Sequence, residues 1–469
     1  MIERTMQYYK PEGALFVGDC MPFYHQGTFH LYYLLDEGHH AARGGLGGHQ
    51  WAHASTTDLV HWAHHPLALA IDAPWEGSIC TGSVFYHEGT FYAFYATRMP
   101  DRSQHLGLAT GSDGIHFAKT QPNPFASPPE GYSPLHYRDP FVFRDESGQG
   151  FHMLVTASIE EPGLYGRGGC LLHLTSKDLR NWQPAGPFIV PGGERGHPSV
   201  PECPDCFHWN GWTYLLFGLN GPAHYRMSRG PIGPWLRPPV DTFDGVLGAV
   251  MKTAPYGEGR RLGAFFLNSR AGGRDDGARL YAGNAVLREL VQHEDGTLGT
   301  QFVPEMIPRA GDPLDLPFRA LTAGVSGAEG RVAISAMEGL GAGMLERVPV
   351  DARVSLTVRP DGACADIGLC FRGSGRWESG YELHVLPYER QVTLNEQALS
   401  CVEGLDRPFK LDVILQGDIV DVCIDERRCL IDRCPALKGE RLFFYCQNGQ
   451  VAFESIEVRR IEGEADGER

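Results

Sequence analysis

Short apolar strands alternate with turn glycines along the first 300 residues, and this alternation repeats. Each repeat contains a hairpin with apolar and aromatic positions on both sides of a glycine, at residues 21–33, 82–95, 140–154 and 204–217. Each also contains a strand that leads through small or polar residues to an aromatic, at Trp62, Phe117, Trp182 and Trp235. Repeats of 53 to 65 residues with this content are typical of β-propeller blades of about four strands each.

The repeat of strands and turn glycines continues for one more unit, and then the pattern of the sequence changes. A fifth repeat is expected across residues 262–299, which would make the propeller five-bladed over residues 1–305. A β-sandwich with coincidental spacing would share the alternation, whereas an α/β barrel is not expected because long helical patterns are absent. A Pro-rich stretch then predicts a linker at 306–320, and further strands predict a β-sandwich domain at 321–460, followed by a polar tail at 461–469. We therefore expect an all-β protein.

The composition and charge of the chain indicate which kinds of binding partner to expect. Gly and Pro make up about a fifth of the 469 residues, which suits many tight turns. The formal net charge is −16 and the sequence has no cluster of Lys and Arg, which argues against nucleic-acid or anionic-membrane partners. A small, uncharged oligosaccharide fits this charge better, because it needs no electrostatic steering.

Targeting signals are also absent from the sequence pattern. The first 13 residues have no apolar core of signal-peptide length, and no apolar run reaches the roughly 20 residues of a membrane span. The twelve cysteines are scattered rather than arranged as a disulfide framework. We therefore expect reduced thiols and a cytoplasmic location. The oligomeric state is left open, with a homodimer as one option.

Three carboxylates occupy the same place in three repeats. Asp19 lies eight residues before the turn glycine of its hairpin, and Asp139 and Glu202 lie nine before theirs. The second repeat has Thr81 at this place. Because the first strand of each blade lines the propeller axis, we expect these acids to meet in one funnel, beside Arg138. Such a cluster is electrostatically costly and is usually functional.

Each acid alone has a structural explanation. An Asp before a Pro, as at Asp139, is a common turn signal, and Glu202 could simply open a strand. Their shared register favours function. Two carboxyl groups that flank a scissile bond are what glycoside hydrolysis requires, one as acid and one ionised, and a third can hold sugar hydroxyls.

These motifs resemble glycoside hydrolase family 32, the β-fructofuranosidase, inulinase and levanase group. The resemblance rests on the stretch 51–62 with 66–69, on Arg-Asp-Pro at 138–140, on Glu-Cys-Pro-Asp at 202–205 and on Leu-Arg-Glu-Leu at 287–290. It implies a five-bladed propeller and a retaining mechanism. Asp19 would be the nucleophile, Glu202 the general acid/base and Asp139 the stabiliser of the transition state.

The resemblance also suggests the walls of the site, without a metal or other cofactor. Substrate contacts are expected from Arg138, Cys203, Thr81, Ser83, Trp51 and His49. The Cys203-x-x-Cys206 pair has zinc-like spacing but no second pair.

The chain departs from the family pattern around the sugar. The usual Trp-Met-Asn-Asp-Pro-Asn-Gly motif becomes Phe16-Val-Gly-Asp-Cys-Met-Pro22, so Gly18 lacks an amide that would contact the sugar. Leu34 replaces a Gln, Leu46 replaces a Trp that faces the pocket, and Cys80 opens the loop that the family writes Phe-Ser-Gly-Ser. A glycine-rich stretch, residues 38–48, adds histidines near the funnel. We expect an altered sugar preference.

Three functions stay open. The leading hypothesis is a retaining, exo-acting hydrolase of short β-fructofuranosides or a closely related furanoside. The alternatives are an inverting pentofuranosidase on the same scaffold and a non-catalytic sugar-binding protein. The three acids argue against the last, because a binding protein gains nothing from keeping a costly carboxylate cluster.

Overall fold

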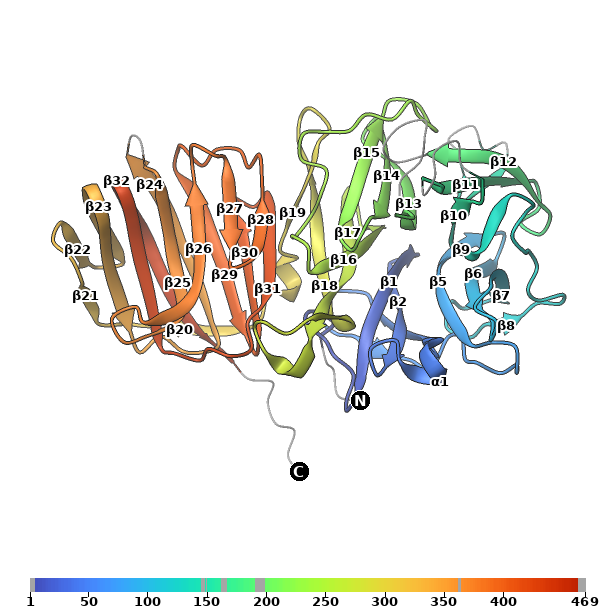
Figure 1. Cartoon of the computed structure of the whole chain (residues 1–469), viewed down its shortest axis with the longest axis horizontal. Helices are drawn as coiled ribbons and strands as arrows, with labels where there is room; N and C mark the ends of the chain where they lie inside the picture. The colour runs from blue at the N-terminus through green and yellow to red at the C-terminus, as the bar shows by residue number, and fades with distance from the viewer. Residues whose placement is uncertain are drawn as a thin grey trace. The chain divides into compact units, whose positions relative to one another are not determined.

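The computed structural model describes residues 5–144, 148, 150–161, 167–189, 199–361 and 364–462. The chain forms two compact units. The first contains residues 1–242, 248–269 and 280–298, and the second contains residues 243–247, 270–279 and 299–469. The polar tail predicted at 461–469 falls outside the described residues beyond residue 462. Both units are built almost wholly of antiparallel strands, which confirms the predicted all-β fold (Figure 1).

The first unit is the predicted β-propeller. Its first two blades are formed by β1(Leu15–His25), β2(Thr28–Glu37), β3(Gln50–Thr56) and β4(Ala63–His64), and by β5(Ser78–His87), β6(Thr90–Arg98), β7(Gln104–Gly111) and β8(Ala118–Lys119). The next two are formed by β9(Tyr132–Phe143), β10(Phe151–Ile159), β11(Gly169–Ser176) and β12(Trp182–Ile189), and by β13(Glu202–Trp209), β14(Trp212–Gly218) and β15(Ala223–Ser228). The fifth is formed by β16(Gly248–Tyr256), β17(Arg260–Arg270) and β18(Arg279–Gln292), and β19(Leu298–Gln301) pairs with β18 where the chain passes into the second unit.

The first strands of the blades form the inner wall of a closed ring. In chain order, β1, β5, β9, β13 and β16 each contact the next, and β16 contacts β1. A short pairing between Val17 of β1 and Gly283 of β18 joins the fifth blade to the first. The ring thus brings the starts of strands that are far apart in sequence to one place.

Apolar cores lie between neighbouring blades. One includes Tyr32, Trp51 and Tyr95 of the first two blades, and the next includes Phe94 and Met153 of the second and third. These side chains come from the alternating apolar positions of the hairpins, so the apolar periodicity of the sequence marks the strands that form these cores.

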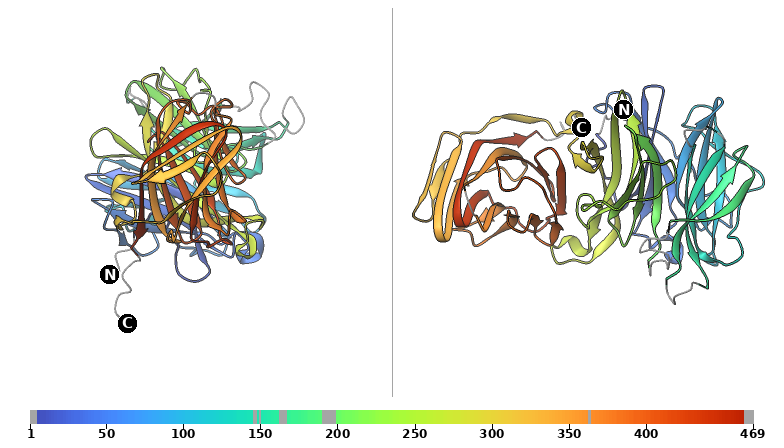
Figure 2. Two further views of the ribbon diagram at one scale, coloured as in Figure 1. Left: turned by 90° about the vertical axis from the view of Figure 1, so that its left-hand side faces the viewer. Right: turned by 90° about the horizontal axis from the view of Figure 1, so that it is seen from above.

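The second unit is a β-sandwich with a continuous apolar core (Figure 2). A 21-residue strand, β32(Arg441–Ile461), pairs with β20, β23, β24 and β25 and is the organising element. The other strands are β20(Ala310–Pro313), β21(Phe318–Ala320), β22(Val325–Ala328), β23(Arg331–Glu346), β24(Ala352–Asp361), β25(Asp366–Ser374), β26(Ser379–Leu386), β27(Gln391–Leu394), β28(Gln397–Leu399), β29(Phe409–Gln416), β30(Ile419–Ile424) and β31(Arg428–Arg433).

Helices contribute little. The structure has one four-residue helical turn, α1(Ala42–Gly45), and the short 3₁₀ turns Ala271–Gly273 and Pro304–Met306 among its described residues. Within that part of the chain, no helix has the length and apolar character to cross a membrane.

Candidate active site

A β-bulge lies near the start of the first strand of every blade. The pairing register shifts between Val17 and Cys20 in β1, between Ile79 and Gly82 in β5, and between Glu202 and Asp205 in β13. Comparable shifts occur beside Asp139 in β9 and between residues 249 and 252 in β16. Bulges re-aim side chains and are common beside active sites. The bulges of β1, β9 and β13 contain or adjoin the three predicted acids.

Three residues of these bulges, Asp139, Cys203 and Val250, adopt left-handed backbone conformations. Asp139 has φ 57° and Cys203 has φ 50°. A non-glycine residue in this region costs of order 1–3 kcal/mol, and surrounding contacts must stabilise it. Asp139 is fixed by hydrogen bonds from Thr156 Oγ1 (2.9 Å) and from the Cys203 backbone N–H (3.1 Å), both to its Oδ2. The bulges of the third and fourth blades therefore stabilise each other.

Asp19 is held by three different strands. The Thr81 hydroxyl of β5 and the Cys203 thiol of β13 (3.4 Å) donate to its Oδ2, and the Tyr281 hydroxyl of β18 donates to its Oδ1 (3.1 Å). Burial is the main cause that raises the pKa of Asp19. The Thr81 hydrogen bond opposes this rise, and the nearby Glu202 carboxylate adds to it.

Asp139 also has a raised pKa. Burial raises its pKa to about 6, with further contributions from Glu202 and Asp19, while Arg138 and the Cys203 N–H act in the opposite direction. The Arg138 Nε lies 3.5 Å from Asp139 Oδ2. This carboxyl group therefore changes its protonation state close to neutral pH.

Glu202 is the accessible acid of the three. Its side chain is 38% exposed, whereas that of Asp139 is 3% exposed. Arg138 Nη2 donates to Glu202 Oε1 at 2.5 Å. Burial opposes ionisation of Arg138, but Glu202 and Asp139 together raise the pKa of its guanidinium above the ordinary value. Arg138 thus remains a cation and links two of the acids.

Further charges lie behind the acids. Lys252 of β16 is buried and donates to the Pro204 carbonyl at 2.9 Å. Burial lowers its pKa, although Cys203, Asp205, Asp139 and Asp19 favour its charged form. Asp205 accepts from the N–H (2.7 Å) and hydroxyl (2.5 Å) of Thr253. The end of the Glu-Cys-Pro-Asp motif is thereby joined to the fifth blade.

The structure brings some of the other predicted contacts to the acids and not others. Arg138, Cys203 and Thr81 all touch a carboxylate, as described above. Ser83 is buried and instead links blades, donating to the Pro140 carbonyl at 2.9 Å and accepting from the Val142 N–H at 3.2 Å. Its hydroxyl makes these backbone contacts rather than one to the acids, and its expected contact with the sugar stays a prediction.

Trp51 and His49 also make no hydrogen bond to the three acids that the structure shows, and their expected sugar contacts stay predictions. Trp51 is fully buried in the core between the first two blades, and its indole N–H donates to the Cys80 carbonyl at 2.9 Å. His49 is 2% exposed, and its Nε2 lies 2.9 Å from Asp36 Oδ1. Trp51 packs behind the wall of the site, and His49 is held there by Asp36.

Tyr281 and Asp36 were not predicted from the sequence. Tyr281 reaches Asp19 from a strand 262 residues later, and no local motif marks it. Asp36 is fully buried and also accepts hydrogen bonds from the backbone N–H groups of His39 and His40. The substitution at Gly18 and the glycine-rich stretch at residues 38–48 are the sequence signals that pointed to this part of the site.

Metal ligands are not grouped in this unit or elsewhere in the part of the chain that the structure describes: it contains no set of three or more His, Cys, Asp or Glu that could hold an ion. Cys203 and Cys206 are both free thiols. Burial raises the pKa of both thiols well above the ordinary value, which disfavours the thiolate form that binds metals.

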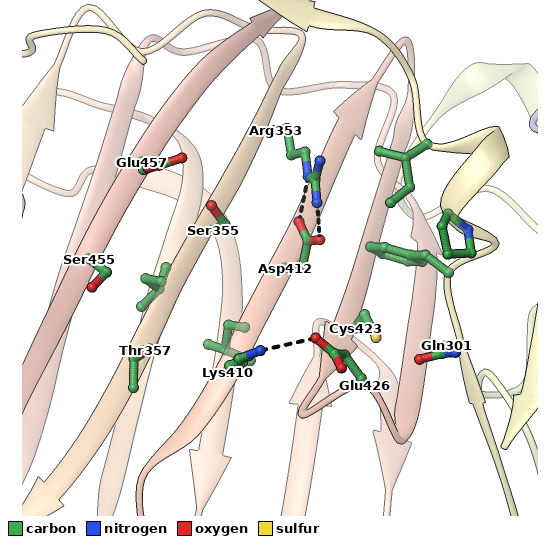
Figure 3. Close-up of a pocket in the computed structure, with 15 residues that line it drawn as sticks. Gln301, Arg353, Ser355, Thr357, Lys410, Asp412, Cys423, Glu426, Ser455 and Glu457 are labelled. Carbon is green, nitrogen blue, oxygen red and sulfur yellow. Dashed lines mark hydrogen bonds and ion pairs between the residues drawn. The ribbon is translucent and has the colours of Figure 1, made fainter. Parts of the chain in front are cut away.

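A separate pocket lies on the sandwich (Figure 3). Its charged side chains are already paired: Arg353 donates to Asp412 at 2.9 and 2.6 Å, and Lys410 lies 3.2 Å from Glu426. Internally neutralised pairs leave little unsatisfied charge for a ligand. This pocket lacks the buried, mutually repelling acids that mark the propeller site.

Fold and site together define a class of protein: a five-bladed β-propeller with a carboxylate triad at its inner strands, accompanied by a β-sandwich. Residues 18–230 match the family model described as the glycosyl hydrolases family 32 N-terminal domain. This region is therefore similar to the N-terminal domain of glycoside hydrolase family 32.

Curated relatives agree with this similarity. The chain is 30% identical over 231 residues to sucrose-6-phosphate hydrolase of Escherichia coli, which covers 47% of this chain and 43% of the relative. It is 28% identical over 214 residues to raffinose invertase of Escherichia coli, which covers 43% of this chain and 41% of the relative. The match therefore spans less than half the length of these relatives.

Solved structures share the fold over nearly the whole chain. Fructan 1-exohydrolase IIa from Cichorium intybus has a TM-score of 0.74 at 15% identity, covering 99% of this chain and 98% of that one. Exo-inulinase from Aspergillus awamori has a TM-score of 0.72 at 16% identity, covering 98% of each chain. At such identities the similarity concerns the propeller and the sandwich, not the substrate.

Proposed function

We propose that the protein is a retaining glycoside hydrolase that cleaves β-fructofuranosides or a closely related furanoside. The observation that carries this proposal is the convergence of Asp19, Asp139 and Glu202, which a single residue, Cys203, and one cation, Arg138, connect. Hydrolase and invertase relatives support the substrate class. The matched region, residues 18–230, contains all three acids, which supports their proposed roles.

The three acids divide the reaction between them. Asp19, ionised, attacks the anomeric carbon while Glu202 gives its proton to the departing glycosidic oxygen, so a glycosyl-Asp19 ester forms and the aglycone leaves as an alcohol. Glu202 then takes a proton from water, and the water oxygen replaces the Asp19 carboxylate at the anomeric carbon. Both acids return to their starting states, and the configuration is retained.

The exposure of each acid suits its role. Glu202 is the exposed member, so it can meet both the leaving group and the incoming water. Asp139 is buried and ionises only above about pH 6, so it can grip sugar hydroxyls and develop charge where the transition state becomes positive. Arg138 holds Glu202 in place, and its positive charge lowers the pKa of Asp139 against the effect of burial.

The altered wall supports a furanoside that differs from fructose at one or more hydroxyls. Gly18, Leu34, Leu46 and Cys80 replace polar or aromatic groups that the family uses around the sugar. A lost hydrogen bond in such a site costs about 1–3 kcal/mol. This observation also keeps an arabinofuranoside-type substrate as a second candidate, with an exo-acting mode on short oligosaccharides in either case.

The thiols support the proposed location. All twelve cysteines are free in the structure, and eleven of them are buried. Secreted proteins tend to pair such residues, so free thiols favour a reducing compartment such as the cytoplasm.

The test is a substrate screen of the full chain. Purified protein is incubated with sucrose, inulin-type and levan-type oligosaccharides, difructose anhydrides and aryl arabinofuranosides, beside Asp19→Ala and Glu202→Ala. We expect hydrolysis of at least one furanoside, and a loss of at least about 10³-fold in kcat in each variant with an unchanged circular-dichroism spectrum. Equal activity in wild type and variants would refute the assignment, and binding without turnover would favour the sugar-binding alternative.

A further inference from the structure

Tyr281 contacts the oxygen of Asp19 that Thr81 and Cys203 leave free. Its hydroxyl donates to Oδ1 at 3.1 Å, whereas the other two donors both reach Oδ2. A carboxylate bound on both oxygens from three strands cannot rotate without breaking a hydrogen bond. The phenol is therefore part of what sets the direction of this side chain.

Gly18 creates the space for that phenol. A Cβ atom at this position would lie 2.7 Å from the Tyr281 hydroxyl oxygen and 3.2 Å from both Tyr281 Cε1 and Leu34 Cβ. Contacts under 3.0 Å force something to move. Any larger residue at position 18, including the Asn of the family pattern, thus competes with the Tyr281 hydroxyl for one volume.

The glycine-rich stretch at residues 38–48 and the adjoining His49 surround the Tyr281 ring. His39 Nδ1 is 2.8 Å from the Tyr281 carbonyl, and the His40 ring meets the tyrosine ring edge-on at 5.5 Å. His49 stacks against it at 5.3 Å with 28° between the planes, and Phe266 packs edge-on at 5.2 Å. The histidines of this stretch thus have a common neighbour.

Asp36 organises this arrangement from inside. It accepts from the backbone N–H groups of His39 (2.9 Å) and His40 (2.8 Å) and from the His49 ring (2.9 Å). One buried carboxylate therefore fixes all three histidines that surround Tyr281. The substitution at Gly18 and the unusual histidines become parts of one construction.

We propose that Tyr281 is a positioning residue for the nucleophile Asp19, held by the histidines at 39, 40 and 49 in the space that Gly18 vacates. This inference rests on the proposed function. A hydroxyl that donates to a carboxylate favours the ionised form and fixes its lone pairs. It acts when Asp19 attacks and again when the carboxylate leaves the glycosyl-enzyme, because negative charge is on Asp19 at both points.

The test is Tyr281→Phe, which removes one oxygen and keeps the ring packed between its neighbours. We expect kcat to fall roughly 10–100-fold, as for the loss of a hydrogen bond to a charged group, with KM changed less than about threefold. The acidic limb of the kcat/KM profile should move to higher pH, because Asp19 loses a donor to its ionised form. A residue with only a structural role would lower stability without moving that limb.

Tyr32→Phe is the matched control. Tyr32 is a fully buried tyrosine of β2 whose hydroxyl donates to the Gly114 carbonyl and touches none of the acids. It should lose stability but keep kcat and the pH profile of the wild type at temperatures below unfolding.

A double-mutant cycle tests the contact itself. Gly18→Ala should lower kcat strongly in the wild-type background, because its Cβ displaces the hydroxyl, but much less in the Y281F background. Wild-type values for kcat and the acidic limb in Y281F, or additive effects in the cycle, would overturn this inference while furanoside hydrolysis stands. A wild-type protein that hydrolyses nothing in the screen would overturn the proposed function and this inference with it.

Discussion

Asp139 should make the propeller less stable as the pH rises through the acidic range. In the folded protein its pKa is raised to about 6, chiefly by burial, against an ordinary value of 3.8. Between these two values the folded state retains a proton that the unfolded chain releases. Because the folded state binds more protons there, the free energy of unfolding falls as pH increases from about 4 and levels off above about 6.

The magnitude follows from the two pKa values. Their difference corresponds to at most ~3 kcal/mol, since one pKa unit is about 1.4 kcal/mol. Asp139→Asn cannot ionise and should not suffer this loss, although it pays a pH-independent cost for changed contacts with Thr156 and Arg138. The stability of the variant relative to wild type should therefore improve by ~2–3 kcal/mol between pH 4 and pH 7.5.

Urea unfolding followed by tryptophan fluorescence measures this difference. Seven of the eight tryptophans belong to the first unit, so the signal reports mainly on the propeller. Glu258→Gln is the control, because Glu258 is an exposed residue of the turn between β16 and β17. It should follow the wild type at both pH values. A stability difference between Asp139→Asn and wild type that stays constant, or a variant that becomes less stable relative to wild type toward pH 7.5, would refute the reasoning.

Three further predictions concern ion pairs of graded burial. Lys119→Met should destabilise the protein by ~3–5 kcal/mol in urea unfolding, because it leaves the fully buried Glu76 carboxylate without its cation. Asp72→Asn removes the exposed partner of the same lysine and should cost under ~1 kcal/mol. Equal costs would contradict this. Arg138→Lys should lower kcat roughly 10–100-fold with little change in fold, because a single ammonium cannot contact both Glu202 and Asp139 as the guanidinium does. Unchanged kinetics would show that catalysis does not need both contacts. Arg353→Ala, on the sandwich, should change stability by no more than ~1 kcal/mol and leave turnover unaffected, and a loss of turnover would assign the sandwich pocket a catalytic role.

The sequence allowed the fold and the three acids to be predicted because both follow from local repetition. Apolar alternation around turn glycines revealed the hairpins, and those glycines placed Asp19, Asp139 and Glu202 at equivalent strand positions. A closed ring then makes equivalent positions neighbours. The structure brings all three together through Cys203 and Arg138.

Side-chain direction could not be predicted in the same way. Ser83 follows the bulge of β5, which shifts the alternation of side-chain direction, and its side chain is buried. Trp51 lies in β3, and its side chain is buried in the core between the first two blades. Tyr281 was missed for a different reason. Its contact with Asp19 spans 262 residues and depends on empty space at Gly18, which no periodic pattern encodes.

The most direct test of the central claim is to trap the glycosyl-enzyme. In Glu202→Ala, an aryl furanoside with a good leaving group can still react with the nucleophile, because its departure needs no proton, while the ester hydrolyses slowly without a general base. Peptide mass spectrometry of the quenched variant should find one furanosyl unit on the peptide that contains Asp19, and none in the Asp19→Ala/Glu202→Ala double variant. A furanosyl unit on another residue, or turnover that gives the inverted anomer with no ester formed, would contradict the account.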